Sequence, residues 1–290
     1  MEKVLALVVT HNRKALLAEC LAALAQQTYP LAHILVVDNA SSDGTAELLA
    51  GYPQIQQLRL EQNLGAAGGF HHGLRVARQM PFDWIWLLDD DAHPVPDSLQ
   101  KLMEGLDQAR RMGEPNLLLS RLVWRDGRDH PMGFPWPDLR RPALFLKART
   151  QRLVPVRFGT YASMLVSRRA ALGHPLPTPE YFLWNDDLEY SGRLLRKGLG
   201  FLVPDSVVVH KTRDPFSSAI RASDEQFYLE ARNRAWLVRS DAFGPLGKAF
   251  WTLNSLGLFL DRLRLQGPAG LEVVLRGWLE GWRNPPPKQT

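Results

Sequence analysis

The stretch "DWIWLLDDDAHP" (Asp83–Pro94) joins an apolar run to three successive carboxylates, and it decides the fold. The apolar run 84–88 is typical of a strand that is buried on both faces of a sheet. Three like charges repel one another unless water or a cation surrounds them. Because residues i and i+2 of an extended segment point to the same side, Asp89 and Asp91 can share one ion, while Asp90 faces elsewhere. The stretch predicts either a cation site at a strand end or a solvated acidic loop.

The chain before this stretch alternates between short apolar runs and helical patterns. The segments typical of strands are 4–10, 32–40 and 55–63, and those typical of helices are 13–27, 41–52 and 64–80. Strands that alternate with helices favour right-handed βαβ units and therefore an α/β sheet. Ligands of such sheets bind beyond the carboxyl ends of the strands, where Thr10, Asp38, Asn63 and Asp89 all stand. Four polar groups at one edge are the first functional signal.

After Pro94 the alternation is less regular. We expect a helix at 96–112, a strand and turn at 117–130, a proline-rich loop at 132–142, a strand near 161–166, and a strand ending on His210. A histidine at a strand end is usually a packing residue, and His210 matters for metal binding only if an ion lies nearby.

A second acidic cluster, "WNDDLEY" (184–190), leads into a helix that Gly198 ends. Carboxylates at a helix start are favoured by the helix dipole, so capping is one interpretation of Asp186 and Asp187. The other is a general base, which needs a carboxylate close to an acceptor hydroxyl. Trp184 fits either an apolar platform for a sugar or simple core packing.

The glycine-rich stretch "NLGAAGGF" (63–70) is not a dinucleotide-binding fingerprint, because its glycines follow the third strand and lack the required spacing. The Gly68–Gly69 backbone is suited to close approach of a phosphate or ribose. A plain turn at the entry to a helix is the alternative.

Composition limits the class of protein. The 290 residues allow one large domain, or a core domain with an appendage. The lone cysteine, Cys20, can form no internal disulfide, which fits a reducing, cytoplasmic compartment. Neither a signal peptide nor a membrane-spanning helix is expected, since no run approaches about 18 uncharged apolar residues.

The last 65 residues differ from the body, because much of the net charge of +5 and several tryptophans lie there. A helical pattern carries an apolar stripe at Leu246, Phe250, Leu253, Leu256, Leu260 and Leu263. One interpretation is a helix lying in a membrane interface, with contact through 245–283. The other is that this face packs on the preceding part of the same chain or on a second copy of the chain.

Five stretches, taken in order, resemble the family 2 glycosyltransferases with the GT-A fold. They are 8–30 ("VVTHNRKALLAECLAALAQQTYP"), 34–45 ("ILVVDNASSDGT"), 63–70, 84–94 and 184–198. The resemblance covers about residues 3–235 and is greatest to the galactofuranosyl- and rhamnosyltransferase branch. It implies a GT-A domain at 1–225, with a Rossmann-like, mainly parallel sheet, helices on both faces and a C-terminal helical appendage at 226–290. The nucleotide-sugar half would be about 1–93 and the acceptor half about 94–225.

The resemblance also implies roles for particular residues. The nucleotide pocket would comprise Thr10, Asn12, Arg13, Asp38, Asn63, Gly68 and Gly69. Asp89 and Asp91 match the D-x-D motif and His210 a late metal-binding histidine, so the cofactor would be Mn²⁺ or Mg²⁺. Asp90 would contact the donor sugar and Trp184 the acceptor. The family's base matches Asp187, although the register leaves Asp186 as an alternative.

The expected activity is that of an inverting, metal-dependent hexosyltransferase in polysaccharide or cell-wall biosynthesis. It would move a sugar from a UDP- or dTDP-linked donor to a glycan or lipid-linked glycan, at the inner face of the cytoplasmic membrane, either as a monomer or as a homo-oligomer. A nucleotidyltransferase acting on sugar phosphates is a second enzymatic reading, but the basic glycine-rich loop after the first strand is missing. A basic nucleic-acid-binding protein is a third, but the acidic clusters would repel phosphates.

Overall fold

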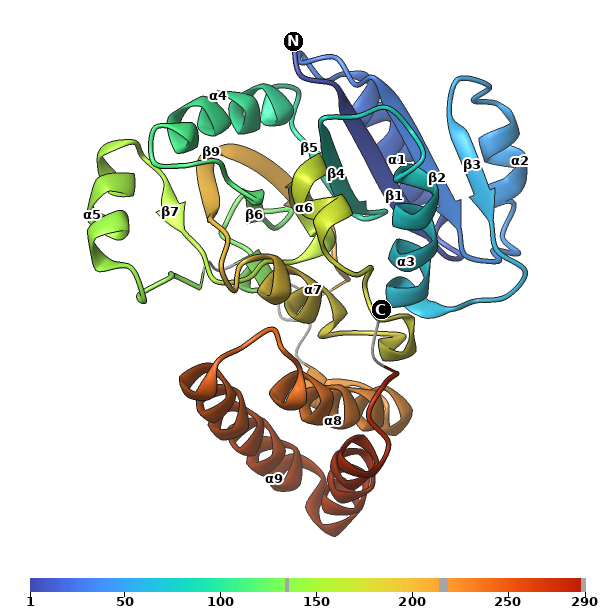
Figure 1. The fold of residues 1–290 in the computed structure, drawn as a ribbon. Helices are drawn as coiled ribbons and strands as arrows, with labels where there is room; N and C mark the ends of the chain where they lie inside the picture. The colour runs from blue at the N-terminus through green and yellow to red at the C-terminus, as the bar shows by residue number, and fades with distance from the viewer. Residues whose placement is uncertain (134–135, 214–218, 288–290) are drawn as a thin grey trace.

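The computed structural model describes residues 1–133, 136–213 and 219–287. One central sheet carries helices on both faces, and two long helices lie apart from it at the C-terminal end (Figure 1). The strands are β1 (Val4–Thr10), β2 (His33–Asp38), β3 (Gln56–Arg59), β4 (Trp84–Asp89), β5 (Ala92–Pro94), β6 (Leu117–Val123), β7 (Val154–Pro155), β8 (Met164–Ser167) and β9 (Gly200–His210). The helices are α1 (Lys14–Ala25), α2 (Thr45–Ala50), α3 (Gly65–Ala77), α4 (Ser98–Arg110), α5 (Pro142–Thr150), α6 (Arg168–Gly173), α7 (Asp186–Leu194), α8 (Asp224–Arg239) and α9 (Pro245–Arg283). Short 3-10 turns are η1 (Pro131–Gly133), η2 (Tyr161–Ser163), η3 (Pro179–Tyr181) and η4 (Ala219–Arg221).

The first four strands form a parallel half-sheet in the order β3-β2-β1-β4. Thr10 lies opposite Asp38, and Val9 lies opposite Asp89, so these strands end at the same level. This half confirms the predicted α/β sheet with βαβ connections. It also explains why polar residues that are distant in sequence gather at one edge.

The second half of the sheet has mixed strand directions. β8 pairs antiparallel with both β4 and β6, whereas β6 and β9 run parallel. β5 pairs antiparallel with β9, which places His210 opposite Ala92, one residue after the acidic triplet. Parallel pairing, which we expected throughout most of the sheet, is complete in the first half and limited to β6 and β9 in the second. The antiparallel pairing of β5 with β9 brings His210 next to the acidic triplet.

The core has one layer on each face of the sheet. Val4, Ala6 and Val8 of β1 pack on the side of α1 and α4. The alternate β1 residues pack on the side of α3, α6 and α7. Alternation along a buried strand supplies both layers because successive side chains point to opposite faces.

The glycine-rich stretch is not a turn before a helix, because α3 begins at Gly65 and contains the glycines. A Cβ on Gly69 would lie 2.3 Å from Cγ1 of Val9, and one on Gly73 would lie 2.7 Å from Leu7. The absence of side chains there lets α3 lie close against β1. Gly65 itself has a φ of +70°, and a Cβ on it would collide with the carbonyl oxygen of Phe182.

The second half of the chain has one strand shorter than predicted and one helix that was not predicted, and one predicted loop is only partly described. The strand near 161–166 begins only at Met164, because 161–163 forms the turn η2. The helix α5 was not expected, since its short apolar pattern follows a proline-rich segment. Part of the predicted loop at 132–142, residues 134–135, lies outside the described residues.

α8 packs against both parts of α9 (Figure 1). The first part of α9 runs antiparallel to α8, with Asn254 beside Arg234 and Arg262 beside Asp224, and the second part runs back along α8. Small residues allow the close approach, since a Cβ on Gly277 would lie 2.5 Å from the carbonyl oxygen of Tyr228 in α8. The two parts of α9 meet at Gly267, whose φ of 63° and ψ of −147° are not helical, and Pro268 begins the second part. Across residues 1–133, 136–213 and 219–287, no helix combines the length and apolarity needed to cross a membrane.

Four leucines of the predicted stripe of α9 do not pack against the sheet-containing part of the chain, whereas Phe250 of the same stripe contacts Trp136, with ring centroids 5.1 Å apart. Leu246 is 88 % exposed and Leu253 is 69 % exposed, and Leu256 and Leu260 are also exposed. The buried face of α9 is instead formed by residues such as Trp251, Ser255, Val273 and Val274. Packing on the catalytic part of the same chain is therefore ruled out for these four leucines.

Candidate active site

The edge where the parallel strands end carries the predicted polar residues. Thr10 and Asp38 end β1 and β2 side by side, and Asp89 ends β4 on the other side of β1. Asn63 follows β3 in the loop that leads to α3. The alignment of strand ends brings these residues to one edge, as ligand sites in parallel sheets require.

Asp89, Asp91 and His210 form a cluster in which one potential ligand atom from each lies within 4.8 Å of the others. Nε2 of His210 lies 3.1 Å from Oδ1 of Asp91. Nδ1 of His210 is buried and has no hydrogen-bond partner among the described residues. Two carboxylates and one imidazole make a donor set that suits a divalent ion of the Mn²⁺ type.

Burial strongly affects the protonation of this cluster. Burial and the negative charge of Asp91 raise the pKa of Asp89 to about 7. Burial alone would lower the pKa of His210, but the hydrogen bond and charge of Asp91 raise it above its ordinary value. A bound cation would offset the repulsion between the two carboxylates, which is the physical reason to expect an ion here.

Asp90 points away from this cluster, as the alternation predicted. Its Oδ2 accepts a hydrogen bond of 2.8 Å from the hydroxyl of Thr10, and its Oδ1 pairs with Arg13 at 3.1 Å. Nη1 of Arg13 also lies 2.9 Å from Oδ2 of Asp91. Burial raises the pKa of Asp90 to about 6, although the charge of Arg13 opposes this. Asp90 thus ties the loop after β1 to the triplet, and its contact with a donor sugar stays a prediction.

The loops after β1, β2 and β3 are joined by amide side chains. Oδ1 of Asn12 accepts from the backbone N–H of Ser42 at 2.7 Å. Asp38 accepts from the backbone N–H of Ser41, and its other oxygen lies 3.7 Å from Nε of Arg59. The binding roles of Asn12, Asp38 and Asn63 stay predictions, but the structure places all three in neighbouring loops.

Asn39 is a member of this network that the sequence analysis missed. Its Nδ2 donates to Oδ1 of Asn63 at 3.0 Å and to the carbonyl oxygen of Gly65 at 2.8 Å. Its Oδ1 accepts from the backbone N–H of Leu64 at 2.9 Å. Its position directly after β2 was the available signal. Asn39 therefore fixes the turn that starts α3.

Gly68 and Gly69 are buried inside α3. Their lack of side chains is explained by packing, since a Cβ would meet Leu64 at Gly68 and Val9 at Gly69. A contact of their backbone with a nucleotide stays a prediction.

The second acidic cluster begins α7, directly after a strained turn. Phe182, Trp184 and Asn185 have φ angles of 63°, 65° and 66°. Positive φ at residues other than glycine costs about 1–3 kcal/mol each and persists only where surrounding contacts enforce it. Such strain is characteristic of functional sites, because a relaxed turn would point the following side chains elsewhere.

Asp186 and Asp187 have different environments. Asp186 is 3 % exposed, and its Oδ2 has no hydrogen-bond partner within the described part of the chain. Asp187 is partly exposed, and its Oδ1 accepts from the backbone N–H of Leu188 at 2.8 Å. Burial raises the pKa of Asp187 to about 7, and the charge of Glu230 adds to the effect. The charge of Asp187 in turn raises the pKa of Asp89, so the two acidic clusters lie within electrostatic reach.

The comparisons with known proteins agree with this geometry. The sequence model of the family described as "Glycosyl transferase family 2" matches residues 6–172, which is more than half of the chain. The galactofuranosyltransferase GlfT1 of Mycobacterium tuberculosis is 33 % identical over 298 aligned residues, with 96 % of this chain and 88 % of the relative covered.

This chain belongs to glycosyl transferase family 2.

One further relative and two solved structures are similar to this glycosyltransferase in sequence and in fold, respectively. The N-acetylglucosaminyl-diphospho-decaprenol L-rhamnosyltransferase of M. tuberculosis is 26 % identical, with 79 % of this chain and 84 % of the relative covered. The structure of S. aureus TarS in complex with UDP-GlcNAc has a TM-score of 0.66 at 15 % identity, covering 96 % of this chain and 81 % of TarS. The mannosyltransferase PcManGT of Pyrobaculum calidifontis, in complex with GDP-Man and Mn²⁺, has a TM-score of 0.56 at 18 % identity, covering 97 % and 75 %. The expected galactofuranosyl- and rhamnosyltransferase branch and the GT-A fold are confirmed.

In this glycosyltransferase, α8 holds the strained turn before α7. Nδ2 of Asn233 donates to the carbonyl oxygens of Tyr181, Leu183 and Trp184, at 2.9, 2.7 and 3.0 Å. Oε2 of Glu230 accepts from Nδ2 of Asn185 at 2.7 Å. Sequence analysis missed both residues, because a contact across more than 40 residues leaves no local pattern. Trp184 is half-buried in this turn, and its contact with an acceptor stays a prediction.

Proposed function

We propose that the chain is an inverting, metal-dependent glycosyltransferase that moves a sugar from a nucleotide-diphosphate donor to a hydroxyl of a glycan or lipid-linked glycan. The observation that carries the proposal is the presence of two unlike acidic clusters within electrostatic reach of each other. One contains a histidine and is suited to a cation, and the other contains a partly exposed carboxylate of raised pKa. Metal and base are the two parts that a single displacement at an anomeric carbon requires.

Asp89, Asp91 and His210 would hold the ion, and their geometry fits it. The imidazole favours Mn²⁺ over Mg²⁺, since Mg²⁺ prefers oxygen ligands alone. A bound ion would supply positive charge next to the diphosphate that leaves the sugar. PcManGT, which has the same fold, binds Mn²⁺ with its nucleotide sugar.

Asp187 would accept the proton of the attacking hydroxyl. Asp186 is a weaker candidate because it is almost fully buried, whereas Asp187 is partly exposed. A pKa of about 7 suits a base, since the ionised form is available at neutral pH and still binds a proton firmly. Attack from the side opposite the leaving diphosphate inverts the anomeric centre.

The nucleotide would lie over the loops after β1, β2 and β3, near Thr10, Asn12, Arg13, Asp38 and Asn63. Asn39 supports this assignment, because it locks two of these loops in one arrangement. The nucleobase of the donor is expected to be uracil or thymine, as in the UDP- or dTDP-linked donors of the predicted branch.

A thermal-shift screen of nucleotide sugars, with and without Mn²⁺, tests the function. A donor at about 100 times its dissociation constant stabilises the fold by about 2.7 kcal/mol. The stabilising donor is then incubated with simple glycoside acceptors, and the anomeric configuration of the product is read by NMR. Stabilisation that needs Mn²⁺, followed by transfer with inversion, supports the proposal. Release of pyrophosphate from a nucleoside triphosphate and a sugar phosphate would instead show a nucleotidyltransferase.

The C-terminal region, 226–290, is proposed to bring the catalytic domain, 1–225, to a lipid-linked acceptor at the cytoplasmic face of a membrane. Leu246, Leu253, Leu256 and Leu260 expose an apolar surface on α9 that no described residue covers. Lys248 and Arg264 stand on the same helix. Such a helix suits a membrane interface, where each basic residue adds about 1 kcal/mol with anionic lipid. The name of the rhamnosyltransferase relative refers to a decaprenyl-linked sugar, which supports a lipid acceptor here.

Flotation on anionic liposomes at low salt tests the membrane contact. The full chain should float, and the triple variant L253Q/L256Q/L260Q should stay in solution with an unchanged circular dichroism spectrum. If neither protein floats, and sedimentation shows a dimer that only the triple variant loses, the surface joins two copies of the chain and the membrane proposal is wrong.

A further inference from the structure

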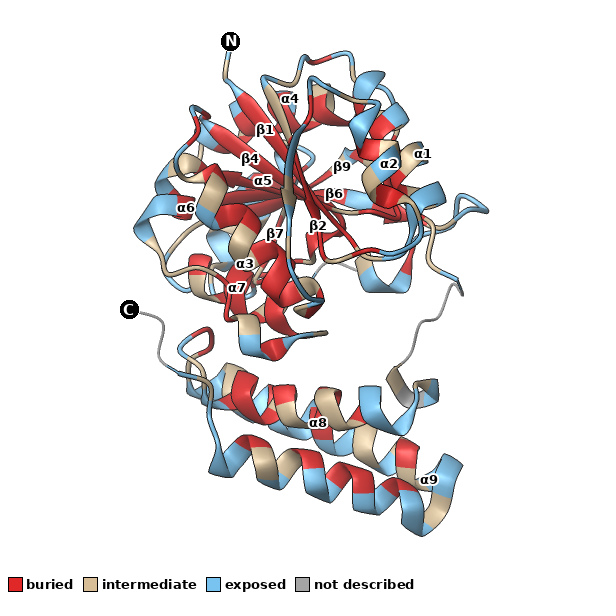
Figure 2. Cartoon of the chain, turned by 90° about the vertical axis from the view of Figure 1, so that its right-hand side faces the viewer, coloured by how far each residue is buried: buried red, intermediate tan, exposed pale blue. Residues whose placement is uncertain are grey.

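The turn after β6 folds back on its own strand and brings a buried histidine, His130, to the end of the sheet. Most residues of β6 and β9 are buried, and the two strands end side by side (Figure 2). Gly127 has a φ of +81°, which permits the reversal of the chain. The backbone N–H of His130 then donates to the carbonyl oxygen of Leu122 at 2.9 Å. The sequence analysis did not single out His130.

Three side chains of this turn hold the segment that follows β9. Nε1 of Trp124 donates to the carbonyl oxygen of Thr212 at 3.3 Å, and Nη2 of Arg125 donates to that of Lys211 at 3.0 Å. Nε2 of His130 lies 2.9 Å from Oγ1 of Thr212. The turn therefore fixes the chain directly beyond the proposed metal ligand that ends β9.

The hydrogen bonds of His130 determine which of its ring nitrogens carries the proton. The backbone N–H of Met132 donates to Nδ1 of His130 at 3.2 Å. A backbone N–H can only donate, so Nδ1 is the acceptor and carries no proton. Nε2 carries the proton of the neutral imidazole and donates it to the hydroxyl oxygen of Thr212. A neutral ring adds no positive charge beside an ion.

His210 lacks the hydrogen bond that usually orients a metal-binding imidazole. Its Nε2 faces Asp91, and for its buried Nδ1 the structure shows no hydrogen-bond partner among the residues that it describes. Metal-binding histidines commonly donate their second ring N–H to a carboxylate, a carbonyl or a water molecule, which fixes the ring. Because the torsion that turns a histidine ring is otherwise broad, the ring of His210 needs another support.

The ring of His130 provides this support by packing on the ring of His210. The ring centroids are 4.7 Å apart and the planes are tilted by 40°. This distance is within the range of about 4.5–7 Å that is typical of packed ring pairs. His130 is 1 % exposed and His210 is 2 % exposed, so neither ring can turn without displacing the other in a close-packed interior.

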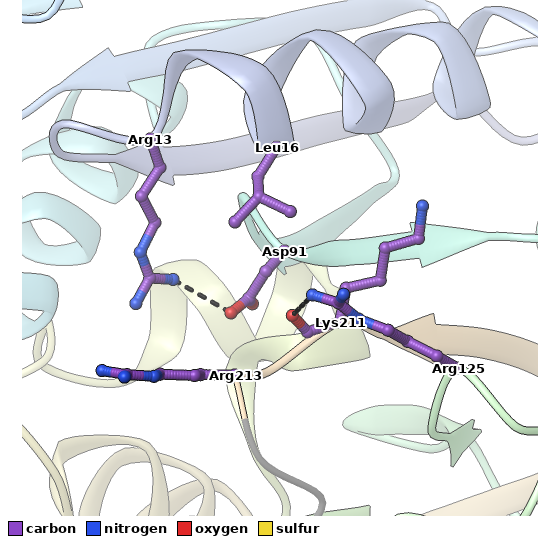
Figure 3. Close-up of a pocket in the computed structure, with 6 residues that line it drawn as sticks. All are labelled: Arg13, Leu16, Asp91, Arg125, Lys211 and Arg213. Carbon is purple, nitrogen blue, oxygen red and sulfur yellow. Dashed lines mark hydrogen bonds and ion pairs between the residues drawn. The ribbon is translucent and has the colours of Figure 1, made fainter.

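We propose that His130 is a positioning residue that holds His210 in the orientation needed to bind the divalent ion. The inference rests on the proposed function, because it concerns the ion of that site. Asp91 borders a cavity of about 300 Å³ together with Lys211, and His130 is not among the residues that line it (Figure 3). His130 therefore acts through the buried ring of His210, and the cavity beside Asp91 stays open to a ligand.

The test measures Mn²⁺ affinity of the full chain from the EPR signal of free Mn²⁺, with and without saturating UDP. Thr212→Val keeps the shape of the side chain but removes the hydroxyl that His130 bonds, and His130→Phe keeps a ring but removes both hydrogen bonds. Each should weaken Mn²⁺ binding about tenfold or more, since outer-shell partners of metal ligands contribute about 10- to 100-fold. The double variant should bind as H130F does, because both changes remove the same hydrogen bond.

Thr212→Ser and His71→Phe are the matched controls. T212S retains the hydroxyl and should bind Mn²⁺ as the wild type does. His71 also bonds a backbone group, the carbonyl of Pro177, but it does so from α3. H71F should keep wild-type affinity for Mn²⁺. If H71F loses as much affinity as H130F, the loss reflects a general disturbance of the fold and the inference is wrong.

Pulsed EPR at saturating Mn²⁺ shows directly whether His210 still binds the ion. The ¹⁴N coupling of a manganese-bound imidazole should be present in the wild type and in T212S, and it should be weakened or lost in T212V and H130F. Weaker binding with an unchanged coupling would overturn the inference, since His210 would then still be in place. Unchanged affinity in both variants would show that His130 is a packing residue only.

The failure of this inference is distinguishable from that of the proposed function. If the wild type binds Mn²⁺ and transfers sugar while T212V and H130F behave as T212S does, the positioning role is wrong and the transferase stands. If the wild type binds no Mn²⁺ with or without UDP, the metal dependence in the proposed function fails, and this inference fails with it.

Discussion

The two acidic clusters of this glycosyltransferase differ in how their charge is compensated. Asp90 and Asp91 pair with Arg13, and Asp91 also contacts His210. Asp186 and Asp187 have no ion pair with a basic side chain within the described residues, and Glu230 adds a further negative charge nearby. In the first cluster, His210 and Arg13 lower the pKa of Asp91 against the effect of burial, whereas burial raises the pKa of Asp89 to about 7 and that of Asp90 to about 6. Carboxylates that are desolvated beside another acid gain affinity for protons.

The two clusters are also built differently. The first follows a regular strand, and its geometry comes from the register of β1, β4 and β9. The second follows a turn with three positive φ angles, which Asn233 and Glu230 of α8 hold in place. The comparison implies that the metal cluster depends on the sheet, whereas the proposed base depends on the C-terminal helices. Four experiments can break or sharpen this division.

The largest effect is expected at Asp187. The substitution Asp187→Asn keeps the size of the side chain but removes proton affinity, so kcat should fall on the order of 10²- to 10⁴-fold. Donor binding in Mn²⁺, measured by calorimetry, should be unchanged. This pairing of results would show that the second cluster handles a proton and not the metal.

The matched control is Asp186→Asn. It should lose much less activity, because Asp186 is buried and cannot reach an acceptor. A variant pair in which D186N is inactive and D187N is active would move the base to Asp186 and show that the predicted register is off by one residue.

The next effect concerns the first cluster. Asp91→Ala should weaken Mn²⁺-dependent binding of UDP or dTDP by about 100-fold or more, since even outer-shell partners of a metal contribute about 10- to 100-fold. Calorimetry with and without EDTA measures the metal-dependent part. Unchanged affinity in Mn²⁺ would show that Asp91 does not bind the metal. The proposed division, with metal binding in the first cluster and proton transfer in the second, would then be wrong.

The first cluster could be predicted from the sequence, and the support of the second could not. The apolar run 84–88 sets a strand, so Asp89 and Asp91 fall at its end, and the same reasoning places Thr10 and Asp38 beside them. His210 was recognisable as a strand end, but its contact with Asp91 depends on the antiparallel pairing of β5 with β9. That pairing leaves no trace in hydrophobic periodicity.

The remaining parts depend on contacts between distant segments. Asn233 reaches the turn before α7 from the middle of α8, and Arg125 reaches Lys211 because β6 and β9 are neighbours. The glycine stretch was misjudged for a similar reason. Position 69 must be glycine because a Cβ there would collide with the side chain of Val9 in β1. Val9 is distant in sequence, so the residues around Gly69 do not reveal this contact.

A smaller effect is expected when α8 releases the strained turn. Asn233→Ala removes the side-chain donor of the Leu183 and Trp184 carbonyls and one of the donors of the Tyr181 carbonyl, which Arg232 still contacts, so the turn should relax and displace Asp187. We expect kcat to fall about tenfold or more, since small misplacements of a catalytic group are costly. The KM for the donor should be unchanged, because the first cluster is built on the sheet.

Asn254→Ala is the control for N233A. Asn254 is an exposed residue of α9 that bonds Arg234 and does not touch the turn. It should keep wild-type kcat. If N233A raises the donor KM and leaves kcat intact, α8 supports the donor site and the proposed division between the clusters is wrong.

The smallest effect is a difference in how stability depends on pH. The folded pKa of Asp187 is about 7, above the unfolded value of about 3.9, so the native state binds the extra proton. Its contribution to stability is favourable at low pH and is lost as pH rises toward about 7. Asp89 behaves in the same way without metal, since its pKa is also raised to about 7.

In EDTA, the melting temperature of the wild type should therefore fall between about pH 5 and 7.5 more steeply than that of D187N. Saturating Mn²⁺ should keep Asp89 ionised and make both curves flatter, while the difference between wild type and D187N remains. If Mn²⁺ removes that difference as well, Asp187 senses the metal directly and the two clusters act as one site.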